Sequence, residues 1–149
     1  MTADDVLGAA WATLARLFMT KRNTFLEMSR RLGLTPPQTH ALVTLADGPV
    51  RMGSMAETML CDASYITSIV DRLEELKLAE RRPSPVDRRV KEVALTPAGR
   101  QAVHELQAAM FEPPAALRAL PERDQRDLAR IARRLAPADG DPAAPFGLR

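Results

Sequence analysis

The sequence predicts a mainly α-helical fold that carries one small β-hairpin. Apolar residues recur at helical spacing through most of the 149-residue chain. Residues 80–95 differ, because two β-compatible flanks enclose a turn at Ser84 and Pro85. Hydrophobic residues make up 46% of the chain and charged residues 27%, so we expect residues 1–149 to form one globular domain.

The first helix is expected to begin near Asp4 and Asp5, which suit the positive end of a helix dipole, and to end at Gly33. Its apolar stripe follows helical spacing and contains Trp11, Leu14, Phe18, Phe25, Met28 and Leu32. A stripe of this length needs a packing partner, either within the chain or in a second subunit. Residues 11–28 could instead line an apolar pocket, but packing is the favoured interpretation.

The next helix should begin at Thr35, where threonine caps, Pro36 fills the first turn and Gln38 completes a capping box. Gly48 and Pro49 end it. Residues 50–52 could pair as a short third strand beside the hairpin.

Two short helices follow. Ser54 and Glu57 form a capping box for the first of them, and Cys61 and Asp62 make the turn between the two. Asp62 is a good N-cap for the second helix. That helix has an apolar face made of Ile66, Ile69, Val70, Leu73 and Leu76.

The other face of the second helix is polar. It carries Ser64, Tyr65, Thr67, Ser68, Asp71 and Arg72. Hydroxyl groups near a helix N-terminus can reach phosphates or base edges once that end enters a major groove. Taken alone, this pattern favours an ordinary amphipathic surface helix.

The hairpin is locally basic. Residues 80–92 hold five basic and three acidic side chains, a surplus of two that equals the formal net charge of +2 for the whole chain. Arg88 and Arg89 at its tip are the best candidates for contact with phosphate or a minor groove. Asp87 would repel phosphate, so we expect it to brace the hairpin, pairing with Arg72 and holding the two arginines.

The last part of the chain is predicted to be helical with one break. A helix should leave from Thr96 and be interrupted by Pro113 and Pro114, because an interior proline removes a hydrogen bond and clashes one turn back. A further helix restarts at Pro121. Residues 137–149 are rich in Pro, Gly and Ala and are expected to form a mobile tail.

This chain resembles the MarR family of winged helix-turn-helix transcriptional regulators. The resemblance is carried by Ser64, Thr67 and residues 70–74, 80–81, 87–89 and 95–99, which include an Asp-Arg-Arg followed by Leu-Thr-Pro-Ala-Gly. Two features depart from the family: the Pro113 and Pro114 break, and Lys77, where the family usually has a glycine that ends the helix.

The resemblance implies a fold and a function. It implies a winged helix-turn-helix region at residues 35–95 and terminal dimerisation helices at 3–33 and 97–136. The protein would be a homodimer that binds a pseudo-palindromic operator in double-stranded DNA. It would regulate transcription in a sequence-specific manner, with repression favoured over activation. It also implies a small-molecule effector bound between the dimer helices and the DNA-reading region. On this reading Ser64, Tyr65, Thr67, Ser68, Arg72, Arg88 and Arg89 contact DNA, while Asp71 and Asp87 brace the wing.

Other function classes are disfavoured. His40, His104 and Cys61 do not sit at metal-ligand spacing, and no Gly-rich phosphate loop is present, so we expect no metal, no cofactor and no enzymatic activity. Cys61 is expected to be a small buried residue rather than a redox sensor. One cysteine, no signal peptide and no transmembrane run indicate a cytoplasmic protein without membrane contact. The alternatives are a winged-helix module that binds protein instead of DNA, and the dimerisation half of an enzyme such as a methyltransferase.

Overall fold

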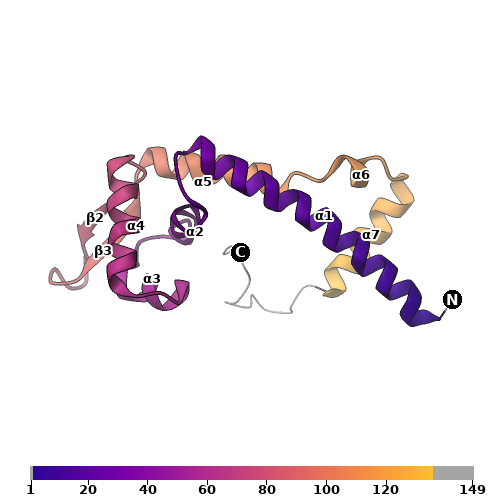
Figure 1. The fold of residues 1–149 in the computed structure, drawn as a ribbon, viewed down its shortest axis with the longest axis horizontal. Helices are drawn as coiled ribbons and strands as arrows, with labels where there is room; N and C mark the ends of the chain where they lie inside the picture. Colours follow the sequence, from indigo (N-terminus) through magenta and orange to yellow (C-terminus); the bar gives the residue numbers. More distant parts are fainter. Residues whose placement is uncertain (1, 136–149) are drawn as a thin grey trace.

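The computed structural model describes residues 2–135, which form seven helices and a three-stranded antiparallel sheet. In chain order the elements are α1 (Ala3–Arg31), α2 (Pro36–Thr44), β1 (Val50–Arg51), α3 (Met52–Met59), α4 (Ala63–Glu75), β2 (Ala79–Pro83), β3 (Lys91–Leu95), α5 (Pro97–Phe111), α6 (Ala115–Arg118) and α7 (Glu122–Leu135). The molecule is elongated, with α2, α3, α4 and the sheet, together called the head, gathered at one end (Figure 1). The predicted tail at 137–149 lies outside the described residues.

The core sits inside the head. The largest buried side chains come from α2 and the residue that follows it, and from α3, α4, β3 and α5, and include Leu42, Leu45, Met55, Ile66, Ile69, Leu73, Val93 and Leu106. The apolar face of α4 predicted from the sequence therefore packs inward, and its polar face is left at the surface. This packing makes the head one solid body that can present a helix and a hairpin together.

The sheet is ordered β1-β3-β2, and its register follows the sequence pattern. Val50 pairs with Val93 and Arg51 with Glu92, so the predicted third strand is confirmed for two residues. In the β2–β3 hairpin, called the wing, Arg81 lies opposite Val93 and Arg82 opposite Glu92. Side chains alternate across a strand, which directs Arg81 toward the side of the sheet that α4 covers.

The start of α3 corrects one prediction. The helix begins at Met52 with Arg51 in the N-cap position, so Ser54 lies inside the first turn and does not cap it. The chain passes from the last residue of β1 directly into the helix. Strand pairing with β3 therefore decides where α3 starts, and it overrides the local capping signal.

Helix α2 ends at Thr44, before the predicted stop at Gly48 and Pro49, whereas the ends of α1 and α4 and the start of α2 agree with the prediction. Thr35 donates its backbone N–H to the Gln38 side chain at 2.9 Å, as a capping box requires. Gly33 follows α1 with a φ of 68°. At the end of α4, Lys77 adopts a φ of 58°, and its N–H donates to Glu74 while that of Leu78 donates to Leu73. This is a Schellman motif, so lysine occupies the left-handed position that glycine usually takes.

The proline break is also present. Helix α5 ends at Phe111, Glu112 is extended, and the one-turn α6 separates α5 from α7. Because Pro113 and Pro114 stop α5, α7 takes its own direction at the end of the molecule opposite the head (Figure 1).

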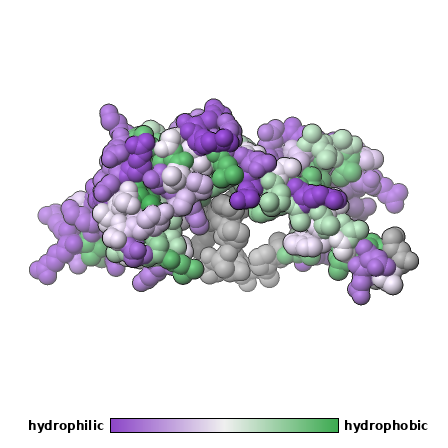
Figure 2. Space-filling model, in the orientation of Figure 1, coloured by the Kyte–Doolittle hydropathy of each residue, from purple (hydrophilic) through white to green (hydrophobic). Residues whose placement is uncertain are grey.

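The apolar stripe of α1 is packed along only half of its length. Met28 is buried against α2 and α5, whereas Trp11 is 70% exposed and Phe18 is 63% exposed. Packing within the chain, one of the two partners considered for this stripe, therefore accounts only for its C-terminal half, and packing of the N-terminal half against a second subunit stays a prediction. The large apolar residues left exposed on α1 and α7 are Val6, Leu7, Trp11, Leu14, Phe18, Met19, Ile131 and Leu135. Hydrophobic residues are visible on this half of the molecule, while the wing end is mainly hydrophilic (Figure 2).

Candidate nucleic-acid interface

Asp62 fixes the N-terminus of α4. Its Oδ1 accepts the Ser64 hydroxyl at 2.5 Å and the Tyr65 backbone N–H at 2.8 Å, as expected of an N-cap. The bond from Ser64, followed by that from Tyr65, lowers the pKa of the Asp62 carboxyl below its ordinary value. The carboxylate therefore stays charged at the positive end of the helix dipole, where a negative charge stabilises the first turn of α4.

The outward face of α4 carries small hydroxyls and one aromatic ring. Ser64, Tyr65, Thr67 and Ser68 are all exposed. The Thr67 hydroxyl donates to the carbonyl of Ala63, and the Ser68 hydroxyl to that of Tyr65, each at 2.9 Å. Both oxygen atoms keep lone pairs directed away from the helix, so this face offers acceptors of the kind that pair with base amino groups.

Arg81 connects the wing to α4. Its Nη2 lies 2.6 Å from Asp71 Oδ1 and 3.3 Å from the Thr67 carbonyl, and its Nη1 contacts the Glu74 carboxylate. The Arg81 backbone N–H also donates to Glu74 at 2.7 Å. Asp71 thus faces the root of the wing. Arg81 was not predicted from the sequence as a site residue. The signal was available, because Asp71 and Glu74 lie one helical turn apart and Arg81 shares the inward side of β2 with Ala79.

Arg72 is placed differently from expectation. Its guanidinium contacts Glu75 at 2.9 Å and the Gly33 carbonyl at 3.4 Å, and Asp87 is not its partner. Neighbouring residues on a helix point about 100° apart, so Arg72 is turned toward the α1–α2 connection while Asp71 is turned toward the wing. The predicted pairing of Asp87 with Arg72 is therefore wrong.

Asp87 instead shapes the tip of the wing. Its Oδ1 accepts the Arg89 N–H and its carbonyl accepts the Val90 N–H, both at 2.9 Å. Buried Ser84 donates its backbone N–H to Val90 at 2.9 Å, and its hydroxyl accepts from Val86 at 3.3 Å. These bonds give the loop one internal shape.

The two arginines at the tip project into solvent. Arg88 and Arg89 are exposed, and within residues 2–135 neither guanidinium forms a hydrogen bond or an ion pair. Their charges are available to an anionic partner. The tip and α4 lie at the same end of the molecule (Figure 1), so a cationic loop lies near the helix that carries the exposed hydroxyl groups.

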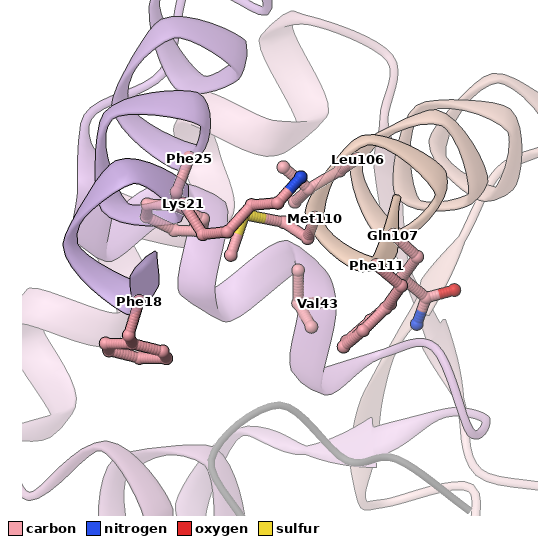
Figure 3. Close-up of a pocket in the computed structure, with 8 residues that line it drawn as sticks. All are labelled: Phe18, Lys21, Phe25, Val43, Leu106, Gln107, Met110 and Phe111. Carbon is pink, nitrogen blue, oxygen red and sulfur yellow. The ribbon is translucent and has the colours of Figure 1, made fainter. Parts of the chain in front are cut away.

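A small cavity lies behind the head, between α1, α2 and α5. Its volume is about 160 Å³, and its lining is almost wholly apolar. It is lined by Phe18, Lys21, Phe25, Val43, Leu106, Gln107, Met110 and Phe111 (Figure 3). The Lys21 ammonium is the one cation of this lining, and it donates to the Ala109 carbonyl at 2.9 Å.

The remaining chemical candidates show little organisation. Cys61 is half-buried, and it borders a separate hollow of about 450 Å³ together with His40 and Tyr65. Over residues 2–135, no three His, Cys, Asp or Glu side chains are grouped so as to hold a metal ion. Over the same stretch, no helix has the length and apolar character to cross a membrane.

Comparisons with known proteins agree with the helical fold and the small sheet described above. Residues 32–90 match the MarR family. A Bacillus subtilis (strain 168) protein, YsmB, described as an uncharacterised HTH-type transcriptional regulator, is 32% identical over 81 residues. That match covers 54% of this chain and 56% of YsmB, so the chain aligns with about half the length of this curated relative. The family and this relative are regulators of transcription, not enzymes.

Solved structures share the fold over most of the chain. The crystal structure of YusO from Bacillus subtilis is 30% identical, with a TM-score of 0.70, and the match covers 93% of this chain and all of that one. The S. aureus MepR–DNA complex is 19% identical, with a TM-score of 0.58, over 86% of this chain and 99% of that chain.

Proposed function

Because this chain belongs to the MarR family of transcriptional regulators, we propose that it binds double-stranded DNA in a sequence-specific manner through α4 and the wing. The observation that carries the proposal is the Arg81 bridge, which holds an exposed hydroxyl-bearing helix beside a cationic loop. MepR of S. aureus, which has the same fold, has been solved in complex with DNA.

In this proposal the N-terminal half of α4 enters the major groove. Ser64, Tyr65, Thr67 and Ser68 then face bases and phosphates, because they are exposed on one side of that helix. Arg88 and Arg89 follow the sugar-phosphate backbone or enter the adjacent minor groove. Arg72 is the weakest of the predicted DNA contacts, since its guanidinium is engaged with Glu75 and Gly33.

We further propose that the functional unit is a homodimer. The support is the run of large apolar side chains left exposed on the N-terminal half of α1 and on α7. Large apolar side chains that gather at the surface in this number mark an interaction site. A second copy that covers it would place two α4 helices on one face of the DNA, about 34 Å apart, and would read a pseudo-palindromic operator.

Repression with release by a small molecule is the mode of regulation we propose. A dimer that covers its operator blocks access to a promoter. The cavity between α1, α2 and α5 suits an apolar effector, and Lys21 suits an acidic group on that effector. A ligand that binds one arrangement of these helices more tightly shifts the dimer toward that arrangement.

Selection of random DNA by the purified protein, followed by sequencing, tests the proposal. We expect an inverted repeat to be enriched, and the selected DNA to be bound far more tightly than a scrambled duplex. Affinity should fall steeply as salt is raised. A winged-helix module that binds protein would enrich no sequence and show no salt-dependent DNA affinity. That result would overturn the proposal.

A further inference from the structure

Thr96, the N-cap residue of α5, is hydrogen-bonded to the segment that follows α4. The Thr96 hydroxyl donates to the Lys77 carbonyl at 2.6 Å, and the Thr96 backbone N–H donates to the Leu78 carbonyl at 3.1 Å. The same hydroxyl accepts the Gly99 N–H at 3.0 Å, which caps α5. One side chain therefore caps one helix and holds the end of another.

Gly99 brings the two backbones into direct contact. A Cβ atom at this position would lie 1.8 Å from the Leu78 carbonyl oxygen and 2.9 Å from the Leu78 carbonyl carbon. Both atoms belong to the backbone, so no side-chain rotation could relieve the overlap. Space, and not an unusual backbone conformation, requires glycine here. By contrast, a Cβ at Gly53 would meet no atom within 4 Å.

The far side of this contact is rigid as well. Lys77 and Leu78 belong to the Schellman motif that closes α4 on Leu73 and Glu74. The wing separates α4 from α5 along the chain, but in space the end of α4 and the start of α5 are in direct contact. The rest of α5 packs along α1 (Figure 1), whose N-terminal half carries the proposed dimer surface. Any change in the direction of α5 is therefore transmitted to α4.

We infer that Thr96 and Gly99 are positioning residues that set the angle between α5 and α4, and so the half-site separation that the dimer recognises. The inference rests on the proposed dimeric DNA binding and adds the residues that fix its geometry. The contact of Thr96 and Gly99 with Lys77 and Leu78 is here called the clasp. A small rotation at the clasp displaces the two α4 helices of a dimer in opposite directions. The outward face of each α4, which is proposed to contact DNA and is here called the reading face, is unchanged, because neither Thr96 nor Gly99 lies on it.

Two substitutions distinguish the contact with Lys77 and Leu78 from the capping of α5 by Thr96. Thr96→Asp keeps an N-cap that accepts the Gly99 N–H, but it cannot donate to Lys77 and turns a carboxylate toward that carbonyl. Thr96→Ser keeps both bonds and is the matched control. Gly99→Ala pushes the two backbones apart, and Gly53→Ala is its control because that position is open.

The experiment measures binding to duplexes with two half-sites selected by the parent protein, whose separation is changed one base pair at a time. A duplex with a single half-site and a thermal unfolding scan accompany each variant. We expect Thr96→Asp and Gly99→Ala to move the preferred separation, or to reduce the preference for it by about tenfold, with single half-site affinity retained. Thr96→Ser and Gly53→Ala should keep the parent profile.

An unchanged spacing profile in folded Thr96→Asp would overturn the inference, whether or not Gly99→Ala folds. So would a loss of single half-site affinity equal to the loss on the full operator, which would indicate damage to the head itself. If the parent protein binds no DNA, or binds a lone half-site as well as any pair, the proposed dimeric function fails first, and this inference fails with it.

Discussion

The guanidinium of Arg81 in β2 lies 2.6 Å from the carboxylate of Asp71 in α4 and joins the wing to the helix beside it. Isolated ion pairs at a protein surface contribute little to stability. This pair differs because Arg81 also contacts Glu74 and the Thr67 carbonyl, and its side chain is only 24% exposed. A planar guanidinium with several partners fixes an orientation as well as a distance.

The first prediction concerns this network. Arg81→Ala should lower the free energy of unfolding by about 1–3 kcal/mol and weaken operator binding, because hydrogen bonds to charged groups are removed and the wing is released from α4. Arg81→Lys should restore little, since an ammonium cannot reproduce the forked geometry. Urea unfolding and DNA titration measure both effects.

Arg82→Ala is the matched control for stability. It lies next in the same strand, is exposed, and within residues 2–135 its side chain forms no hydrogen bond or ion pair. If Arg81→Ala were no less stable than Arg82→Ala, the bridge would not hold the wing.

The second prediction concerns the wing tip. Arg88→Ala and Arg89→Ala should each weaken binding to operator and random DNA alike. Each should also reduce the slope of log affinity against log salt by about one unit for every phosphate that is no longer neutralised. Titrations at several salt concentrations measure this slope. If the variants lost only the preference for operator over random DNA, with the salt slope unchanged, the wing tip would not contact the sugar-phosphate backbone of the DNA.

The third prediction concerns the reading face. Ser68→Ala should narrow the difference in binding free energy between operator and scrambled DNA by about 1–3 kcal/mol, because one hydroxyl that faces the bases is removed. The salt slope should stay at the parent value. Parallel titration of both duplexes tests this, and an equal loss on both would assign Ser68 to backbone contact instead.

The fourth prediction concerns pH. Hydrogen bonds from Ser64 and Tyr65 lower the pKa of Asp62 in the folded protein, so its contribution to stability is present above the unfolded pKa. That contribution is lost as pH falls through the folded value. Asp62→Ala should therefore be less stable than the parent near neutral pH, and the difference should shrink below about pH 4. Urea unfolding of both proteins across this range provides the measurement. A difference that stays constant down to the most acidic sample would contradict the assignment.

The fifth prediction concerns assembly. Leu14→Glu places a charge on the exposed apolar face of α1 and should convert a dimer to monomer, because burying that charge is costly. Arg16→Glu, an exposed position turned to another side of the same helix, should leave the dimer intact. Sedimentation of both variants decides the matter. A Leu14→Glu protein that stays dimeric would place the interface elsewhere.

Local chemistry was enough to predict several elements. The capping box at Thr35, the N-cap at Asp62 and the break at Pro113 each depend on residues within one turn of one another, and all are present. The hairpin followed from its turn and its flanks, and the polar and apolar faces of α4 from helical spacing.

Features that depend on distant segments were missed. The partner of Arg72 is decided by where α4 packs against the α1–α2 connection, which no local pattern reports. The start of α3 depends on β1 pairing with β3, where Val50 meets Val93, 43 residues away along the chain. The close approach of Gly99 to Leu78 likewise exists only once both helices are in place.

The internal bonding of the wing tip has a consequence for how quickly a partner is engaged. Ser84 and Asp87 hold the loop in one shape through bonds that already exist in the free protein. The conformational entropy of this loop is therefore given up during folding and not again at encounter. The rate at which the protein associates with DNA should then be set by charge-steered diffusion, as expected for a rigid body. A slow ordering of the wing tip after first contact should not limit it.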